Sequence, residues 1–378
     1  MKFLRFLAVL SLILGLVVLG LFISGNQYLL KGVWATYLHG ENSATIDDAR
    51  FFETRTVRAS ATPQAWPVSE DRNNKNLSSE LRTTLEQTGS VAFLVLKEGV
   101  IQYEEYWDGY SDTSRTNSFS MAKSITTLLA QIAIQQGFIK SWDDNVSEYL
   151  PEIEGAYRNE LKLIHLATMT AGLQWNEHYK NPFDITARAY YGPDIEKLML
   201  SEVPVVNPPG KAWEYQSGAS QLLGLVIRKA SGSSLSQFAS QYLWSPIGAE
   251  RDAQWHLDHK NGTELSYCCF NSNARDFARL GQLVLNKGSW NGQSIIDSSF
   301  VELATRPFAE NYYGYSFWLD NDDHLTPVYY MRGILGQYII IIPEKSLVVV
   351  RLGHQRMEKQ DEHPLDFHII VSEVLKYF

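Results

Sequence analysis

The stretch Ser118-Phe-Ser-Met-Ala-Lys-Ser124 lies between a predicted β-hairpin and a predicted helix in this 378-residue chain. Ser120 and Lys123 are three positions apart, a spacing that places two side chains on one face of a helix. If Ser120 opens the helix, its hydroxyl lies beside the Lys123 amine, which can supply the base that a serine nucleophile needs. The alternative is an N-capping serine followed by a solvated lysine, and these residues alone do not decide between the two.

The hairpin and the helix are predicted from the residues on either side of this stretch. Residues 91–96 and 100–107 have the β-branched and aromatic content of strands, and Lys97-Glu98-Gly99 separates them as a turn. A helix is expected over about residues 120–136, because apolar residues recur on one face and Gly137 suits its end.

Three further strands are predicted near the end of the chain, at residues 327–331, 337–342 and 347–352. Early and late strands can share one sheet only if the chain leaves the sheet and returns. We therefore expect an α+β fold in which an antiparallel sheet is flanked by helices, with a helical subdomain over about residues 116–275 beside it.

The N-terminal residues predict a membrane anchor or a signal sequence over residues 1–25. Lys2 and Arg5 precede an almost wholly apolar run at residues 6–23, which is near the minimum for a bilayer span. An uncleaved anchor is favoured, with the catalytic part outside the cytoplasmic membrane, in the periplasm or the extracellular space. A cleaved signal would make the protein secreted.

The remaining chain divides into two expected parts. Residues 26–65 are expected to be a linker or extension, and residues 66–378 a single hydrolase domain. The net charge of −9 gives no electrostatic footprint for a phosphate backbone, so nucleic-acid binding is not expected. Composition says nothing about protein partners.

Cysteine and histidine positions give no metal site. Cys268 and Cys269 are adjacent, an arrangement that rarely suits a relaxed disulfide, so they are expected to be two small buried apolar residues. The segment Trp255-His256-Leu-Asp258-His259 lacks the spacing of a zinc motif and is expected to be a polar surface turn.

Two other segments are candidates for the site. Tyr215 follows a Pro-Pro-Gly turn and could relay a proton between the nucleophile and a leaving group, although one tyrosine among 20 is more often packing. Gly333 would allow close approach to a strand edge, and the N–H of Ile334 could pair with that of Ser120 as an oxyanion hole. A simple glycine-bearing hairpin turn is an equal alternative. The aromatic loop over residues 175–191 could line the cleft or pack on the surface.

Ser120-x-x-Lys123, Tyr215-x-Ser217 and the strand ending at Gly333 together resemble the serine β-lactamase and penicillin-binding-protein superfamily. The resemblance covers about residues 66–378 and is greatest to the class C-like esterase and 6-aminohexanoate-dimer hydrolase branch. Supporting stretches are Leu166-Ala-Thr-Met-Thr-Ala-Gly-Leu173, Asn207-Pro-Pro-Gly210, Ala274-Arg-Asp-Phe-Ala-Arg279 and Gly336-Gln337.

The resemblance implies acyl-enzyme chemistry on a small ester or amide, without metal or organic cofactor. Ser120 would attack the carbonyl, Lys123 and Tyr215 would carry the proton to the leaving group, and water would release the acid. Ser217, Gly333 and Ile334 would surround the substrate.

One departure from the family pattern bears on substrate. Met331 and Arg332 stand where β-lactamases and transpeptidases usually carry a lysine followed by threonine or serine. Met331 cannot meet a substrate carboxylate, and Arg332 is expected on the opposite strand face. Weak or absent β-lactamase activity is therefore expected. The alternatives are a cell-wall peptide DD-peptidase and a penicillin-binding sensor or binding module without turnover.

Overall fold

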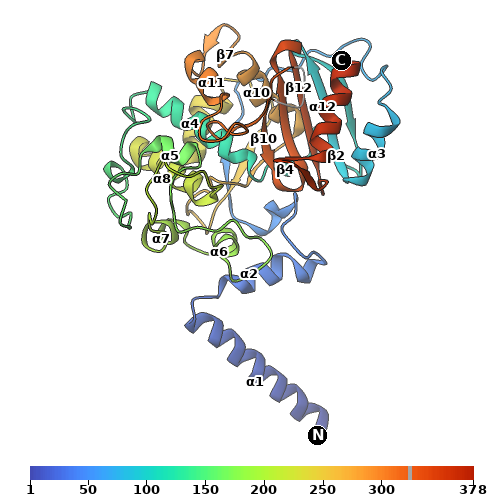
Figure 1. Ribbon diagram of the computed structural model, residues 1–378. Coiled ribbons are helices and arrows are strands. Elements are labelled where there is room, and N and C mark those ends of the chain that lie inside the picture. The colour runs from blue at the N-terminus through green and yellow to red at the C-terminus, as the bar shows by residue number, and fades with distance from the viewer. Residues whose placement is uncertain (322–325) are drawn as a thin grey trace.

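A six-stranded antiparallel sheet forms the centre of the computed structural model, which describes residues 1–321 and 326–378 (Figure 1). The early hairpin joins the late strands because β2 pairs with β12, so Val95 lies opposite Val349. The predicted departure and return of the chain is confirmed, while the edge strand β9 was not predicted. In spatial order the strands are β3 (Val100–Tyr106), β2 (Ser90–Lys97), β12 (Leu347–Gly353), β11 (Gln337–Ile342), β10 (Val328–Gly333) and β9 (Trp318–Asp320).

Helices cover both faces of this sheet, because successive side chains of a strand point to opposite faces. On one face α12 (Leu365–Tyr377) packs with α3 (Ser79–Gln87), and the Phe367 ring stacks on Tyr330 with centroids 4.1 Å apart. On the other face α10 (Ala274–Leu285) lies so close that a Cβ at Gly281 would come within 2.6 Å of Val348.

A mainly helical region lies beside the sheet, as expected, and α4 (Met121–Gln135) runs between the two. Every residue from Met121 to Ala133 is buried, so α4 is a core helix rather than a surface one. The other helices of this region are α5 (Leu163–Ala167), α6 (Ile185–Tyr191), α7 (Ile195–Ser201), α8 (Ser217–Ser231) and α9 (Leu235–Ala239).

A second antiparallel sheet corrects two expectations. Its order is β1 (Thr54–Val57), β5 (Ala253–His256), β6 (Phe270–Ser272) and β4 (Thr116–Asn117). Because β1 pairs with β5, the segment 26–65, expected to be a linker or extension without strands, contributes a strand to this sheet. Trp255 and His256 are fully buried in β5, so the surface turn expected for this segment is wrong.

The N-terminal region consists of a projecting helix and a docked one. Helix α1 (Lys2–Ile23) has no buried residue and extends away from the body in Figure 1. It is long and apolar enough to cross a bilayer, a property that signal sequences share. Helix α2 (Tyr28–Ala35) packs against α6, and the Tyr28 hydroxyl donates a 3.0 Å hydrogen bond to the Pro182 carbonyl.

The remaining elements are short. They are α11 (Ser298–Ala304), the ribbons β7 (Ser289–Trp290) with β8 (Gln293–Ser294) and β13 (Lys359–Gln360) with β14 (His363–Pro364), the 3₁₀ turns at Tyr37–His39, Asp48–Phe51, Val146–Glu148, Ile334–Gly336 and Pro343–Lys345, and a π-helical turn at Ser240–Trp244.

Candidate active site

Ser120 stands at the N-terminus of α4, with Lys123 one turn along. The Lys123 amine donates hydrogen bonds to the Ser120 hydroxyl, at 2.9 Å, and to the Tyr267 carbonyl, at 3.1 Å. The lysine is only 1% exposed, and the Ser120 side chain forms no capping hydrogen bond. The alternative of a capping serine and a solvated lysine therefore does not describe this structure.

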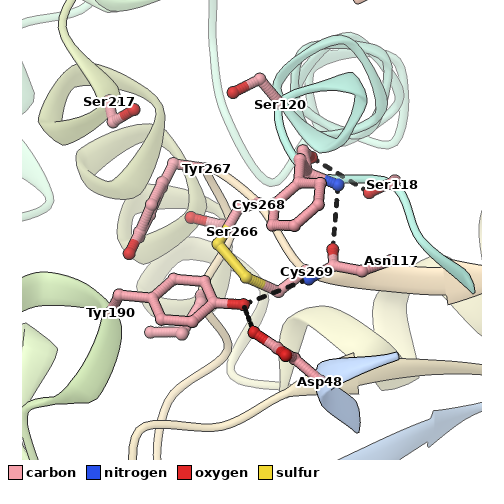
Figure 2. Close-up of a disulfide and its surroundings, with 12 residues drawn as sticks. Asp48, Asn117, Ser118, Ser120, Tyr190, Ser217, Ser266, Tyr267, Cys268 and Cys269 are labelled. Atoms are coloured by element: carbon pink, nitrogen blue, oxygen red, sulfur yellow. Dashed lines mark hydrogen bonds between the residues drawn. A yellow bond between two sulfur atoms is a disulfide. The ribbon is translucent and has the colours of Figure 1, made fainter. Parts of the chain in front are cut away.

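A tight turn between β4 and α4 presents Ser120. Phe119 has a φ of 44°, in the left-handed region that costs a residue with a Cβ about 1–2 kcal/mol. The Asn117 side chain stabilises the turn by accepting a 2.9 Å hydrogen bond from the Phe119 N–H (Figure 2). The Ser118 N–H is held by a backbone hydrogen bond to the Phe270 carbonyl. The strand pairing of β4 thus fixes where the nucleophile points.

The two cysteines form a disulfide beside this site, contrary to the expectation of free thiols (Figure 2). Cys269 has a φ of 71°, so the chain turns there in a way that adjacency in sequence does not reveal. Both residues are buried, and the Cys268 carbonyl accepts a 2.9 Å bond from the Trp255 indole. The bonded pair directly follows Tyr267, whose carbonyl holds the Lys123 amine.

Tyr215 and Ser217 reach the site from the start of α8. The Lys123 amine lies 4.9 Å from the centroid of the Tyr215 ring, a cation–π distance. Ser217 is the first residue of α8. Tyr215 also packs against Trp318 of β9, with ring centroids 5.6 Å apart.

Glu177 is a residue of the site that the sequence did not single out. Its carboxylate accepts a 2.8 Å bond from the Ser217 N–H and a 2.7 Å bond from the Trp175 indole, and the hydroxyls of Ser217 and Tyr179 also donate to it. No spacing rule connects Glu177 with Ser217, which is 40 positions away. The aromatic loop was the available signal, and the structure favours its cleft-lining alternative.

Gly333 ends β10 against the turn that presents Ser120. A Cβ at this position would lie 2.2 Å from the Ser118 carbonyl and 3.2 Å from the Phe119 Cβ. The glycine therefore makes room for the protein's own backbone, whereas the sequence suggested room for a substrate. Ile334 follows directly and lines the space in front of Ser120.

Two cavities meet at Ser120. The first, of about 230 Å³, is bordered by Phe119, Ser217, Tyr267, Cys268 and Ile334 and by residues of α2 and α6. The second, of about 250 Å³, is bordered by Tyr215, Trp318, Gly333 and Ile334 and by the charged residues Glu177, Arg332, Arg356, Lys359 and Glu362. The structure thus brings every predicted site residue to this junction, with Lys123 beneath it.

Arg332 contributes a positive charge to the second cavity. Met331 is fully buried and Arg332 lies on the opposite face, as expected, but that face is the one that borders the cavity. The Arg332 guanidinium stacks on Trp318, 3.1 Å from the ring centroid, and donates a 2.8 Å bond to the Glu362 carbonyl. Burial and the nearby Arg332 charge both lower the pKa of Lys359. The site therefore contains cations without the family's usual lysine.

Within residues 1–321 and 326–378, no group of three or more His, Cys, Asp or Glu side chains has an arrangement that could hold a metal ion. The groups available for chemistry at Ser120 are therefore a buried amine, a phenol, backbone N–H groups and the flanking charged side chains.

Known proteins resemble this chain in sequence and in fold. The chain is 25% identical over 299 residues to the 6-aminohexanoate-dimer hydrolase of Paenarthrobacter ureafaciens, covering 72% of this chain and 75% of that protein. A solved Bacillus anthracis structure, provisionally named a 6-aminohexanoate-dimer hydrolase, superposes with a TM-score of 0.74 at 22% identity and covers 88% of this chain and 92% of that one. A family VIII carboxylesterase structure superposes with a TM-score of 0.60 at 17% identity, covering 83% and 99% of the two chains.

A family model described as Beta-lactamase matches residues 77–371, which include all the residues at the junction of the two cavities apart from those of the N-terminal segment. The match spans most of the chain and agrees with the fold of the solved structures. The chain belongs to the beta-lactamase family.

Proposed function

We propose that this protein is a serine hydrolase that cleaves small ester or amide substrates through an acyl-enzyme on Ser120. The observation that carries the proposal is the 2.9 Å hydrogen bond between the Ser120 hydroxyl and the amine of the buried Lys123. The similarity to proteins named as a 6-aminohexanoate-dimer hydrolase and a family VIII carboxylesterase supports an ester or amide as the substrate class.

Each step of the reaction has a candidate group. The Ser120 hydroxyl attacks the carbonyl carbon while its proton passes to the Lys123 amine, which acts as the base. The N–H groups of Ser120 and Ile334 stabilise the oxyanion that forms. The bond to the leaving group then breaks as that group takes a proton relayed through Tyr215, and a water molecule later attacks the acyl carbonyl to release the acid and restore Ser120.

Two alternatives are distinguished by turnover and substrate. A DD-peptidase would use the Arg332 and Lys359 cations to hold a peptide carboxylate, which the second cavity permits. A sensor would be acylated once and not released. We expect weak cephalosporin hydrolysis, because Met331 replaces the usual lysine; turnover of a cephalosporin at ordinary enzymatic rates would contradict this.

The test is active-site labelling of the full-length chain with a fluorophosphonate probe, read by intact mass. Wild type should gain one adduct and Ser120→Ala none. Ser118→Ala is the matched control, since Ser118 is buried two residues away with its hydroxyl bonded to the Phe119 carbonyl, and it should still label. An unlabelled, folded wild type would show that Ser120 is not activated. Steady release of product from an ester panel would then separate the hydrolase from the sensor.

The proposal includes an uncleaved anchor in α1 that holds the catalytic part outside the cytoplasmic membrane. The helix is almost wholly apolar from Phe6 to Ile23, and Lys2 and Arg5 precede this run, which favours a cytoplasmic N-terminus. An anchored protein should remain in the membrane pellet after alkaline carbonate extraction and should retain the mass of α1. Recovery of a shortened soluble chain would establish a cleaved signal instead.

A further inference from the structure

The cavity on the α2 side of Ser120 has an apolar wall that the reaction described above does not use. Its lining includes Leu29 and Val33 of α2, Ala44, and Ala187, Tyr190 and Tyr191 of α6. We propose that this cavity binds the acyl chain of an amphipathic ester or amide whose polar leaving group occupies the second cavity. The inference rests on the proposed hydrolase function and specifies its substrate class.

The direction of the substrate follows from the position of Tyr215. Ser120 borders both cavities, so the scissile carbonyl lies at their junction. Tyr215 borders the second cavity and is not among the residues that line the first. Because the leaving group must lie beside the residue that protonates it, the leaving group lies in the second cavity. The acyl part of the substrate then extends into the first.

The surface of the first cavity suits a hydrocarbon chain. The Tyr190 hydroxyl is already engaged, donating a 3.0 Å bond to Asp48 and accepting one from Asn117 (Figure 2). The Thr36 hydroxyl donates back to the Gly32 carbonyl of its own helix at 2.8 Å. Among the described lining residues Lys180 alone is charged, and it is exposed. The wall formed by α2 and α6 is therefore mostly apolar, with the hydroxyls of Tyr190 and Thr36 already engaged.

The wall formed by α2 is fixed to the catalytic body. A Cβ at Gly32 would touch the Tyr191 ring at 3.4 Å, so α2 lies directly against α6. The Lys31 amine lies 4.1 Å from the centroid of the Phe52 ring, which adds a second attachment. A fixed apolar wall of this kind can select substrates by chain length.

Helix α2 also places the first cavity close to α1, the proposed membrane anchor. Only residues 24–27 separate α1 from α2, and the outer surface around α2 exposes Trp34 and Leu38, at 46% and 71%. Exposed aromatic and aliphatic side chains beside a span favour contact with the lipid interface. A substrate whose acyl chain lies in the bilayer surface would therefore be close to the opening beside α2.

The cavity volume bears on the chain length. At about 230 Å³, the cavity has room for an acyl chain of several carbons. Burial of each methylene should raise kcat/KM by up to about fourfold until the cavity is filled. The rise should therefore continue over several acyl carbons and then level off.

The experiment compares p-nitrophenyl acetate, butyrate and octanoate with the full-length chain in phosphatidylcholine vesicles. The variants are Leu29→Trp, which fills the cavity, and Leu30→Trp, the matched change at the neighbouring exposed residue outside the lining. Ester partitioning into the vesicles is common to all variants and cancels between them. Ala187→Phe fills the cavity from α6 and provides a second test if Leu29→Trp does not fold.

Leu29→Trp and Ala187→Phe should each lower the octanoate-to-acetate ratio of kcat/KM at least about tenfold, the effect of about two methylenes, while Leu30→Trp keeps the wild-type ratio. Equal kcat/KM values for acetate, butyrate and octanoate would overturn the acyl-chain assignment but not the hydrolase proposal. An equal effect of Leu29→Trp and Leu30→Trp on the octanoate-to-acetate ratio would do the same. No turnover of any of the three esters by wild type would overturn the hydrolase proposal itself, and this inference with it.

Discussion

Glu177 is a loop carboxylate that is held by several donors of the site. It accepts four hydrogen bonds, from the Ser217 N–H and hydroxyl, the Trp175 indole and the Tyr179 hydroxyl. Glu177→Gln would turn one acceptor oxygen into a donor facing these donors. We expect kcat/KM on a short ester to fall by roughly tenfold or more, since a hydrogen bond to a charged group contributes about 1.5–3 kcal/mol. Glu202→Gln, which removes the charge from a surface ion pair with Arg188, is the matched control and should leave kcat/KM unchanged.

The disulfide is the second feature that acts at the residue scale. It fixes the chain just after Tyr267, whose carbonyl holds the Lys123 amine. Cys268→Ser should lower kcat by roughly tenfold, equivalent to about 1.4 kcal/mol for one weakened hydrogen bond. Intact mass after alkylation, with and without reductant, should show the bond in wild type. Fully reduced wild type should match the variant in kcat, and an unchanged rate after complete reduction would contradict this role.

At this scale the sequence identified reactive residue types but not their partners. Ser120, Lys123 and Tyr215 could be proposed because their chemistry and local spacing are visible along the chain. Glu177 could not, because its role depends on contact with Ser217 across 40 positions. The disulfide was missed for a similar reason, since it depends on a positive φ at Cys269 that only the folded turn shows.

At the scale of elements, the close contact between β10 and the turn before α4 determines the site geometry. Gly333→Ala would place a Cβ 2.2 Å from the Ser118 carbonyl, so the strand and the turn would have to separate. We expect a loss of about 1–3 kcal/mol in the free energy of unfolding, typical of overpacking, together with loss of most labelling at Ser120.

Gly292→Ala serves as the control for Gly333→Ala. Gly292 also resists a side chain, because its φ is 78°, but a Cβ there would meet no atom within 4 Å. It lies in the β7–β8 hairpin away from Ser120, so the variant should be less stable by about 1 kcal/mol yet label normally. Both variants should be measured by urea unfolding and by the fluorophosphonate adduct, and normal labelling of a stable Gly333→Ala would contradict the packing argument.

Elements with a long local pattern were predictable, and elements made by distant pairing were not. Helix α4 and strands β10, β11 and β12 follow runs of apolar or β-branched residues, and their predicted bounds agree with the structure to within two residues. The strands of the second sheet are two to four residues long, too short for a periodic signal, and they exist because Thr54–Val57 pairs with Ala253–His256. Strand β1 therefore escaped notice within a segment expected to be a linker.

At the scale of the whole molecule, the N-terminal segment packs against the second sheet through a buried aromatic contact. The imidazole of His256 in β5 stacks on Phe52, with ring centroids 4.6 Å apart, and the Lys31 amine of α2 lies over the same Phe52 ring. This junction joins the part of the chain next to α1 to the second sheet. Protonation of a group buried in this junction should therefore lower the free energy of unfolding of the whole protein.

Acid should destabilise the protein through this junction. Burial and the nearby Lys31 charge lower the pKa of His256 to about 3, while the same residue in the unfolded chain titrates near 6.5. As the pH falls from about 6.5 towards 3, the unfolded state binds a proton that the folded state does not. The free energy of unfolding should then drop by up to about 1.4 kcal/mol per pH unit for this group. Burial also lowers the pKa of His363 to about 3, which adds a contribution of the same sign.

Urea unfolding of wild type and His256→Phe at pH 7.5, 6.0 and 5.0 measures this dependence. Phenylalanine keeps a ring stacked on Phe52 but cannot titrate, so the variant should lose less stability between pH 6.0 and 5.0 than wild type, by up to about 1.4 kcal/mol. The same substitution at His178, whose side chain is 73% exposed, controls for the removal of a histidine and should give the wild-type slope. Parallel stability curves for wild type and His256→Phe would mean that the junction tolerates a buried charge, and the acid sensitivity would then have to arise elsewhere.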